Sequence, residues 1–551
     1  MSSAATPPAP DNAPVAAAKF SLAAINFHQR TDRVAECLIY TMVVFSPWAF
    51  GCTNTQALQN WTVFGSTQVW TIWAMTFAGW LLGAMVLAKL AINLRTGYRP
   101  PRWSDPMEDE SEADTDRPIS EGIKDSWNSS LRNMLQHAAT PALALFTALI
   151  LLYCLISAVN ARATYREDLL RFDYFEKTIA WLPHSYDKER TWTLFWNYLG
   201  LAGAFWGIRD WLLGKSTREL RAERKTAAGA AAGVDRISLL PERLRRLLWV
   251  LSVNGALLAI EGIAQRLSGT NKLLWWLPTR LNKEAQYQFG PYAYRSNAAQ
   301  YFNLLWPVAL GFWWTQRRAA QIAAQSGLAK PWRHHLLLPA VTIMAVCPII
   351  SYSRGGVIIT VINLALATLI LLAALKKAHG ATKLGMFVLA LIVLVVGFGM
   401  GGQKLGDRMK EMGSINERER MYEVGHAMAA EHPVFGTGPG SFNMLFQFYR
   451  SSPDDYWPAQ LHNDWLETLI TFGWVGSGLI ATAFLLVAVR RWLPGGIRCG
   501  WRFAALIWLG LIGCLAHARF DFPMQVHSVL FLFLILCAVV FNLSRAPAGG
   551  R

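Results

Sequence analysis

Residues 416–474 read NERERMYEVGHAMAAEHPVFGTGPGSFNMLFQFYRSSPDDYWPAQLHNDWLETLITFGW. This stretch is polar, punctuated by glycine and rich in Arg, His and Glu, whereas the segments on both sides of it are strongly apolar. Stability alone gives a membrane protein no reason to carry such a loop. The pattern therefore predicts that the loop holds part of a reaction centre, and that the rest of the chain is a membrane scaffold that presents it.

The composition of the whole chain is that of a membrane protein. Its 551 residues are 53% hydrophobic and include 25 Trp, and several apolar runs have the length of about 20 residues that a bilayer-crossing helix needs. Backbone groups in lipid must be satisfied within the segment, so such runs indicate helices. We expect an all-α integral membrane protein with about 12 transmembrane helices and a large extracytoplasmic loop. The expected segments are 34–50, 69–93, 139–159, 191–213, 246–266, 298–316, 335–352, 357–375, 383–402, 462–488, 503–516 and 524–543.

The loops between these segments alternate in charge. Lys and Arg gather in every second loop, and positively charged loops remain in the cytoplasm. Both termini are therefore expected in the cytoplasm. The net charge of +16 has the same explanation, and no basic, aromatic module indicates nucleic-acid binding. The loops expected outside are 51–68, 160–190, 267–297, 353–356, 403–461 and 517–523.

Four regions follow from this pattern. We expect a disordered cytoplasmic tail, an N-terminal transmembrane region with an acidic cytoplasmic loop at 95–137, a C-terminal transmembrane core with the outer loop 403–461, and a short cytoplasmic tail. Their bounds are 1–33, 34–245, 246–543 and 544–551. The seven cysteines form no CxxC pair, so the sequence indicates neither a zinc site nor a disulfide framework.

Two arginines are expected at the outer ends of helices. Arg295 lies in QFGPYAYRSNAAQ and Arg354 in SYSRGG, the turn that also contains Ser353. Each arginine could simply extend toward lipid headgroups. A guanidinium also binds phosphate or pyrophosphate through two hydrogen bonds, and the glycines after Arg354 allow backbone N–H groups to approach a ligand. The SYSRGG turn therefore favours an anion site.

The outer loop carries two further candidate elements. In HPVFGTGPGSF, residues Gly436, Gly438 and Gly440 alternate, and such a loop can surround an anion with amide groups. A structural turn explains the glycines equally well. Upstream, residues 416–431 are predicted to form a short amphipathic helix with Arg418 and Arg420, for which a solvated face is the plain alternative.

The start of the tenth segment reads LHNDWLE. His462 at this outer position is a candidate proton acceptor, Asn463 can cap the helix, and Glu467 follows on the same helix. A helix-capping turn is the alternative for the whole element. A smaller outer cluster is explained by ion pairing within its turn and consists of His517, Arg519, Asp521 and His527.

Taken in order, these motifs resemble the bacterial O-antigen ligase/polymerase superfamily, multi-helix membrane glycosyltransferases of the GT-C type. The resemblance covers about 246–543 and rests on FGPYAYRSNAAQYFNLLWP, SRGG, the R..YE and HPVFGTGPGSF elements, and HNDWLETLITFGWVG. The acidic cytoplasmic loop and the outer loop 161–191, with Tyr165, Trp181 and His184, are not typical of the family. The outer loop could contact an acceptor or form an ordered lid.

The resemblance implies transfer of a glycan from undecaprenyl pyrophosphate to an acceptor hydroxyl, at the periplasmic face of the bacterial inner membrane. The residues fit that chemistry, because fixed guanidinium groups stabilise the charge of a departing pyrophosphate. Arg295 and Arg354 would do so, with Arg418 or Arg420 as a third clamp, while His462 accepts the proton and the anomeric carbon inverts. No nucleotide cofactor is needed. No Asp-x-Asp element stands in an outer loop, so we expect a metal-independent reaction.

Several alternatives remain open at this stage. A lipid A–core acceptor would make the chain a ligase, which we favour for its helix count and single large outer loop. A glycan acceptor would make it a polymerase, and a protein hydroxyl would make it an O-oligosaccharyltransferase. A lipid-linked glycan transporter also fits twelve segments. Transporters place ionisable groups near the midplane of the membrane, whereas here only Glu261 and Gln265 stand out there.

Overall fold

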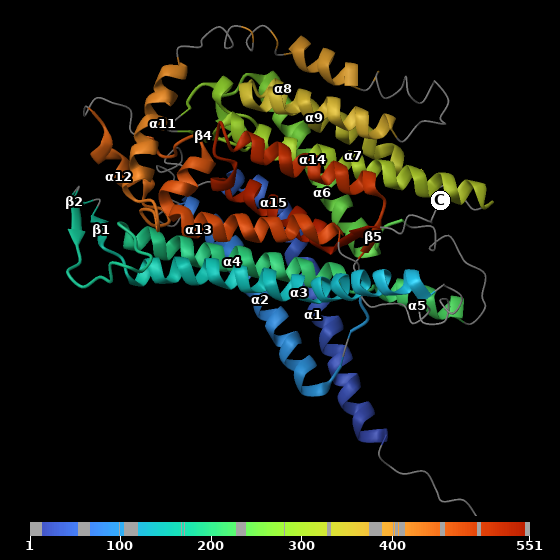
Figure 1. Ribbon diagram of the computed structural model, residues 1–551. Helices are drawn as coiled ribbons and strands as arrows, with labels where there is room; N and C mark the ends of the chain where they lie inside the picture. Colours follow the sequence, from blue (N-terminus) through green and yellow to red (C-terminus); the bar gives the residue numbers. More distant parts are fainter. Residues whose placement is uncertain are drawn as a thin grey trace, which may run out of the picture.

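The computed structural model describes most of the chain, and the described part is mostly helical (Figure 1). The described residues are 14–52, 67–98, 100–103, 119–166, 168–169, 171–227, 239–279, 282–327, 332–373, 388, 390–400, 402, 406, 414–451, 458–492 and 497–545. The acidic run of the cytoplasmic loop, the first thirteen residues and the end of the C-terminal tail lie outside this set.

A helix lies in each of the twelve expected segments. The helices are α1 (Pro14–Trp48), α2 (Thr67–Thr96), α3 (Ile119–Val159), α4 (Lys188–Leu213), α5 (Thr217–Ala227), α6 (Glu242–Ser268), α7 (Arg295–Gln325), α8 (Leu337–Ile350), α9 (Arg354–Leu372), α11 (Ser414–Glu431), α12 (Phe442–Phe446), α13 (Asp464–Val489), α14 (Trp501–His517) and α15 (His527–Asn542). A further helical stretch, Ala390–Met400, lies in the ninth segment.

Six helical stretches in the described ranges are long and apolar enough to cross a membrane. Four lie within α2, α3, α6 and α9, and the other two are Arg333–Ile350, which includes α8, and Asp464–Trp492, which includes α13. Ala390–Met400, α14 and α15 are apolar but shorter. The multi-pass membrane class follows from these helices, while the figure of about 12 crossings stays a prediction.

Three short strand pairs accompany the helices. Antiparallel hairpins form from β1 (Ala163–Arg166) with β2 (Arg171–Tyr174) and from β3 (Lys272–Leu273) with β4 (Leu277–Pro278). A parallel pair joins β5 (Ile497–Cys499) to β6 (Leu543–Arg545).

Helices α1 and α3 begin far before the expected segments. Residues 14–33, expected in a disordered tail, are helical because α1 begins at Pro14, and the alanines that follow favour helix. Residues 119–137 of the expected cytoplasmic loop are also helical, as the first part of α3.

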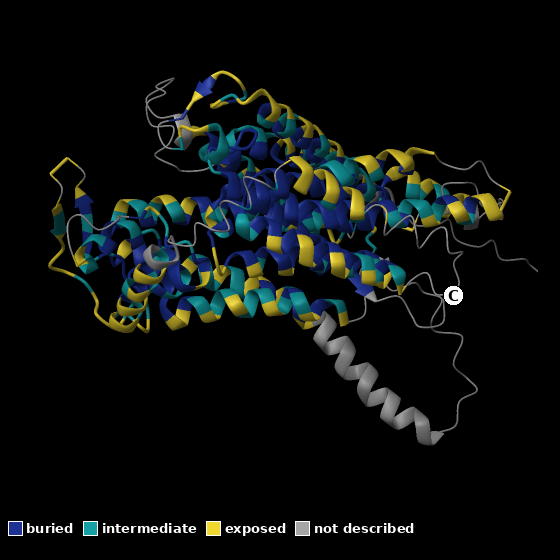
Figure 2. Cartoon of the chain, turned by 90° about the horizontal axis from the view of Figure 1, so that it is seen from above, coloured by how far each residue is buried: buried dark blue, intermediate teal, exposed yellow. Residues whose placement is uncertain are grey.

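The centre of the bundle consists of α7 and α15. The sequence of α15, HSVLFLFLILCAVVFN, is apolar on every side, which is typical of a helix surrounded by protein. The rings of Phe302, Trp306 and Phe312 in α7 are fully buried. Figure 2 shows buried residues through the middle of the molecule and exposed residues along its outer helices and hairpins.

Close packing of α2 against α4 depends on glycine. A Cβ atom on Gly79 would lie 2.0 Å from the carbonyl oxygen of Gly200, and one on Gly203 would lie 2.3 Å from the carbonyl oxygen of Gly79. Small residues allow helix backbones to approach in this way in membrane proteins, where van der Waals packing holds helices together.

A buried charge network ties four helices together away from this contact. Lys89 of α2 binds Asp32 of α1 and, at 2.9 Å, Asp210 of α4. Arg243 of α6 binds Asp32 at 2.7 Å, and Arg102 binds Asp210 at 2.5 Å. Removing one partner of such a network leaves a buried charge uncompensated, so the network fixes how these helices sit.

One helix lies across the others. Figure 1 shows α11 running crosswise over one end of the bundle, at the end where β1, β2 and α12 also lie. Its bounds, Ser414–Glu431, confirm the amphipathic helix expected at 416–431. Met421 and Met428 are its buried residues that join the cluster shared with α12 and α13.

The glycine contact predicts a stability difference. We expect Gly79→Ala to lower the thermal unfolding midpoint in detergent, by an amount equivalent to about 1–3 kcal/mol, because the added methyl group forces the α2 and α4 backbones apart. Gly478→Ala in α13 is the control, because a Cβ there meets no atom within 4 Å. Equal midpoints for the two variants would contradict the assignment.

Candidate active site

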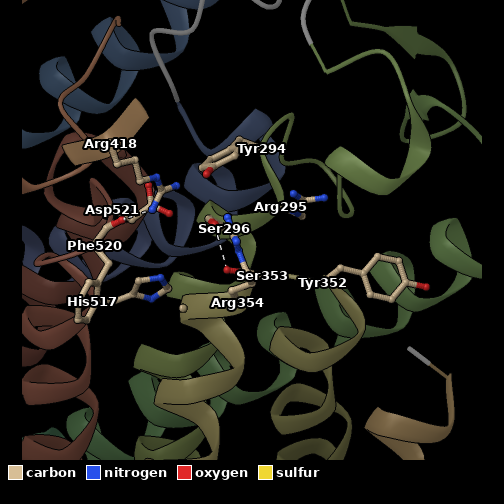
Figure 3. A pocket seen from close by; sticks show the side chains of 11 residues that line it. Tyr294, Arg295, Ser296, Tyr352, Ser353, Arg354, Arg418, His517, Phe520 and Asp521 are labelled. Atoms are coloured by element: carbon tan, nitrogen blue, oxygen red, sulfur yellow. Dashed lines mark hydrogen bonds between the residues drawn. The ribbon is translucent and has the colours of Figure 1, made fainter. Parts of the chain in front are cut away.

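A pocket opens where the ends of several helices meet at the α11 end of the bundle. It has a volume of about 60 Å³, several times what one water molecule needs. Its lining residues come from the start of α7, the turn between α8 and α9, α11, and the turn after α14 (Figure 3): Tyr294, Arg295, Ser296, Tyr352, Ser353, Arg354, Gly355, Arg418, His517, Phe520 and Asp521.

The turn between α8 and α9 is shaped by close packing. Ser353 caps α9, and its Oγ accepts a hydrogen bond from the Gly356 amide at 3.1 Å and lies 3.0 Å from Ser296 Oγ of α7. A Cβ on Gly356 would lie 2.5 Å from the Ala299 side chain, so glycine lets α9 approach α7. A Cβ on Gly355 would lie 2.9 Å from His517 Nε2. The SRGG glycines therefore bring three elements together around the pocket.

Three guanidinium groups border the pocket. Arg354 is the first residue of α9 and extends from that helix start, while the Tyr352 ring points away (Figure 3). Arg418 of α11 donates to the Phe520 carbonyl at 3.0 Å. Arg295 donates to the Gln286 carbonyl at 2.8 Å, so its guanidinium also holds the preceding loop. Among the described residues that line the pocket, Asp521 is the single carboxylate, which leaves an excess of positive charge.

His462 is held beside the pocket by several contacts. Its Nδ1 lies 3.0 Å from Asp521 Oδ1, and its carbonyl accepts a hydrogen bond from Tyr422 at 2.9 Å. Its ring packs against Phe522 at a centroid distance of 4.9 Å and Tyr294 at 6.1 Å. The backbone of His462 has φ 57°, a conformation that these contacts maintain. Within the described residues, His462 Nε2 makes no hydrogen bond.

The electrostatics of Asp521 suit it to support an imidazole. Burial alone would raise the pKa of this carboxyl, but the hydrogen bond to His462 and the charges of His462, His517 and Arg418 together lower the pKa below its ordinary value. The carboxylate therefore remains ionised, and it also accepts the Phe522 amide at 3.2 Å. An ionised carboxylate fixes the orientation of a neighbouring histidine and stabilises its charged form.

The structure brings most of the arginine candidates together. Arg295, Ser353, Arg354 and Arg418 line the pocket, and His462 lies one side chain away through Asp521. The predicted proton acceptor and the predicted guanidinium clamp thus lie at the same end of the bundle, although they come from helices far apart in the sequence.

Other candidates lie at neighbouring positions with different contacts. Arg420 is exposed and does not line the pocket. Asn463 caps α13 by accepting from the Leu466 amide at 3.3 Å. Glu467 accepts from the Leu461 amide at 2.7 Å, so it fixes the turn before His462. The carboxylate that orients the imidazole is Asp521, because Glu467 is engaged with the backbone.

The loop that contains Gly436, Gly438 and Gly440, here called the glycine loop, packs against a break in α13. Gly473 interrupts that helix with φ 58° and ψ −169°, which leaves nearby carbonyl groups without their helical partners. The amides of Thr437 and Gly438 donate to the carbonyls of Ile470 at 2.8 Å and Thr471 at 2.9 Å. The loop therefore completes the hydrogen bonding of a broken helix.

The three loop glycines have φ angles of 63°, 99° and 82°, which favour glycine. A Cβ on Gly436 would lie 2.5 Å from the Ile470 carbonyl oxygen, and one on Gly438 would lie 2.4 Å from Ser185 Cα. Gly440 packs against Leu194 and Arg190 in the same manner. None of the three lines the pocket.

Two pocket residues, His517 and Asp521, were assigned no role in the site from the sequence, where ion pairing within their turn explained them. His517 ends α14, and Asp521 lies in the turn that follows. The available signal was their position between the last two apolar segments, in an outward-facing turn that is short and rich in charge. His462, the partner of Asp521, lies more than fifty residues earlier, so only the fold shows the pairing.

Comparison with protein families identifies part of the chain. Residues 339–481 match a family described as O-antigen ligase. The matched stretch includes Arg354, α11 and His462, whereas Arg295 and Asp521 lie outside it. The match confirms the resemblance seen in the sequence and supports a membrane glycosyltransferase of the O-antigen ligase or polymerase type. No curated protein matches the chain.

The contacts of the glycine loop predict the effect of filling it. We expect Gly436→Ala to lower the thermal unfolding midpoint in detergent, because alanine disfavours φ 63° and its methyl group meets the α13 backbone. Gly478→Ala again serves as the control. A Gly436→Ala protein of unchanged stability that loses only affinity for inorganic pyrophosphate would instead favour an anion-binding loop.

Proposed function

We propose that this chain, which carries an O-antigen ligase domain, transfers a glycan from undecaprenyl pyrophosphate to an acceptor hydroxyl at the periplasmic face of the bacterial inner membrane. The observation that carries the proposal is the meeting of Arg354, Arg418 and the Asp521–His462 pair around one pocket, at one end of an apolar helix bundle. Both termini are then in the cytoplasm, as the loop charges favour.

The pocket suits the leaving pyrophosphate. Arg354 and Arg418 approach it from different elements, and fixed guanidinium groups stabilise developing phosphate charge without reorganisation. The pocket also lies at the N-terminus of α9, where the helix dipole and the first backbone N–H groups favour an anion. Arg295 contributes from the α7 side while it holds the loop before that helix. We assign Arg418, rather than Arg420, as the third guanidinium.

The Asp521–His462 pair suits the acceptor. The acceptor oxygen attacks the anomeric carbon on the face opposite to the pyrophosphate, the bond from that carbon to the pyrophosphate oxygen breaks, and the configuration inverts. His462 Nε2 accepts the hydroxyl proton, and Asp521 stabilises the resulting imidazolium. The donor is already activated by its leaving group, so the reaction needs no nucleotide, and we propose that it is metal-independent.

Among possible acceptors we favour lipid A–core, which makes the chain ligase-like. A growing glycan, as in a polymerase, and a protein hydroxyl, as in an O-oligosaccharyltransferase, use the same chemistry. A transporter of lipid-linked glycans would concentrate its ionisable groups near the midplane of the membrane. Here the pocket groups gather at helix ends, which supports an enzyme.

The guanidinium clamp predicts a graded loss of activity. Arg354→Ala should lower kcat/KM by a factor of about 100 or more, equivalent to about 3 kcal/mol, because it removes a fixed donor to the leaving group. Arg418→Ala should also lower it, whereas Arg420→Ala should resemble wild type. The measurement is transfer of radiolabelled glycan from purified lipid-linked donor to lipid A–core in detergent. Full activity of Arg354→Ala, or an equal loss in Arg420→Ala, would contradict the clamp.

The imidazole–carboxylate pair predicts non-additive losses. His462→Ala and Asp521→Asn should each lower kcat by a factor of about 100 to 10,000. The double variant should fall little further than His462→Ala, because the two groups act as one unit. Thermal unfolding of each variant checks that the fold is kept. Losses that multiply in the double variant would show that Asp521 acts independently of His462.

A further inference from the structure

A second group of hydrogen-bonding side chains lies at the other end of α11. We call it the distal cluster, and it consists of Arg162, His184, Tyr186 and His432. The Tyr186 ring lies 5.6 Å from the ring of His184 and 5.4 Å from that of His432, between centroids. Arg162 donates to the Tyr186 hydroxyl at 3.2 Å. The mechanism above uses none of these residues.

The distal cluster is built on a fixed loop. The Arg162 amide donates to the Ser185 carbonyl at 2.7 Å, and the Tyr186 amide donates to the Thr437 carbonyl at 3.1 Å. The Asn160 side chain bonds the backbone of the same loop at two further places. These bonds join the 161–191 loop to the glycine loop beside α13, so the distal cluster is preorganised.

The imidazoles of the distal cluster have unused hydrogen-bonding capacity. His184 is 6% exposed, and its Nε2 has no partner among the residues described. The His432 imidazole is half-buried, and it too makes no hydrogen bond to any residue that the structure describes. His184 Nε2 is covered by the protein, so a sugar hydroxyl would reach the partly exposed His432 imidazole. Glu431 and Tyr449, bonded to each other at 2.7 Å, add polar groups at the edge.

Aromatic rings with open faces adjoin the distal cluster. Phe448 is 62% exposed and lies 5.3 Å from Phe172, between ring centroids, while Tyr174 is 67% exposed. Exposed apolar surface beside hydrogen-bonding groups marks an interaction site. A sugar ring presents an apolar face of C–H groups and a rim of hydroxyls, and both find counterparts here.

The charge state of the distal cluster favours a neutral ligand over a phosphate. Burial, and then the charge of Arg162, lowers the pKa of His184 to about 4. Burial also lowers the pKa of His432, although the neighbouring Glu431 charge opposes the shift. A neutral imidazole offers one donor and one acceptor, which suits a hydroxyl group. The pocket, by contrast, is lined by three guanidinium groups, whereas Arg162 of the distal cluster donates to the Tyr186 hydroxyl.

The geometry of α11 connects the two places (Figure 1). His432 follows Arg418 by fourteen positions, close to four helical turns, so both lie on the same side of the helix about 21 Å apart. We propose that the distal cluster binds sugar residues of the donor glycan, several units away from the carbon that is transferred. The inference rests on the proposed function, under which the donor is a glycan whichever acceptor is used.

The test varies the length of the donor glycan. Lipid-linked glycans extracted from the bacterium that makes this protein are separated by length, and each is used with one fixed acceptor. For wild type, kcat/KM should rise from single-repeat to multi-repeat donors. His432→Ala and Phe448→Ala should each lower kcat/KM for multi-repeat donors by about tenfold, and change that for single-repeat donors by less than about twofold. The control is His335→Ala, because the exposed His335 imidazole lies just before α8, at the end of that helix away from the pocket.

The outcomes separate this inference from the proposed function. Equal losses with both donor lengths, or no loss in either variant, would overturn it. A changed dependence on acceptor length at constant donor length would likewise overturn the assignment to the donor. If wild type forms no product with any donor, the proposed function fails. Calorimetric titration with free glycan released from the carrier then decides the distal cluster, since wild type should bind it and His432→Ala should not.

Discussion

Charged side chains are costly in hydrocarbon, and this single constraint organises the end of the molecule where the pocket lies. Arg295, Arg354 and His462 all stand at or beside the first residue of an apolar helix. Packing then determines whether helix ends meet. The contact of Gly356 with Ala299 sets α9 directly against α7, and the hydrogen bond from His462 to Asp521 joins the start of α13 to the turn after α14. The pocket is where these contacts converge.

Much of the fold could be predicted from the sequence, because apolar runs and helical periodicity are local properties. The twelve expected segments each contain a helix, and α11 was expected almost at its observed bounds. Local patterns also pointed to Arg354, Arg418 and His462. They could not show that Asp521 orients His462, because that pairing depends on how α13 and α14 pack.

The glycine loop is a second feature whose role could not be predicted from the sequence alone. Alternating glycines are compatible with an anion site and with a structural turn, and the sequence contains nothing that decides between them. The deciding feature is the break at Gly473, whose neighbouring carbonyls need donors. Likewise, the alanine-rich start of α1 carries helix propensity, although a composition rich in Ala, Pro and Ser without an apolar core predicted a disordered tail.

The break in α13 has a consequence for redesign. Tyr153 of α3 donates to the carbonyls of Phe435 and Phe472. These two hydrogen bonds join α3, the glycine loop and α13 at one junction. Insertions or bulky residues at this junction would misalign His462, the proposed proton acceptor, a few turns away. In the hairpin formed by β1 and β2, the ends of β2 carry exposed side chains, and the described residues of β2 make no hydrogen bond to this junction. Under the proposed function, engineering for a different glycan would therefore vary the hairpin and leave the junction intact.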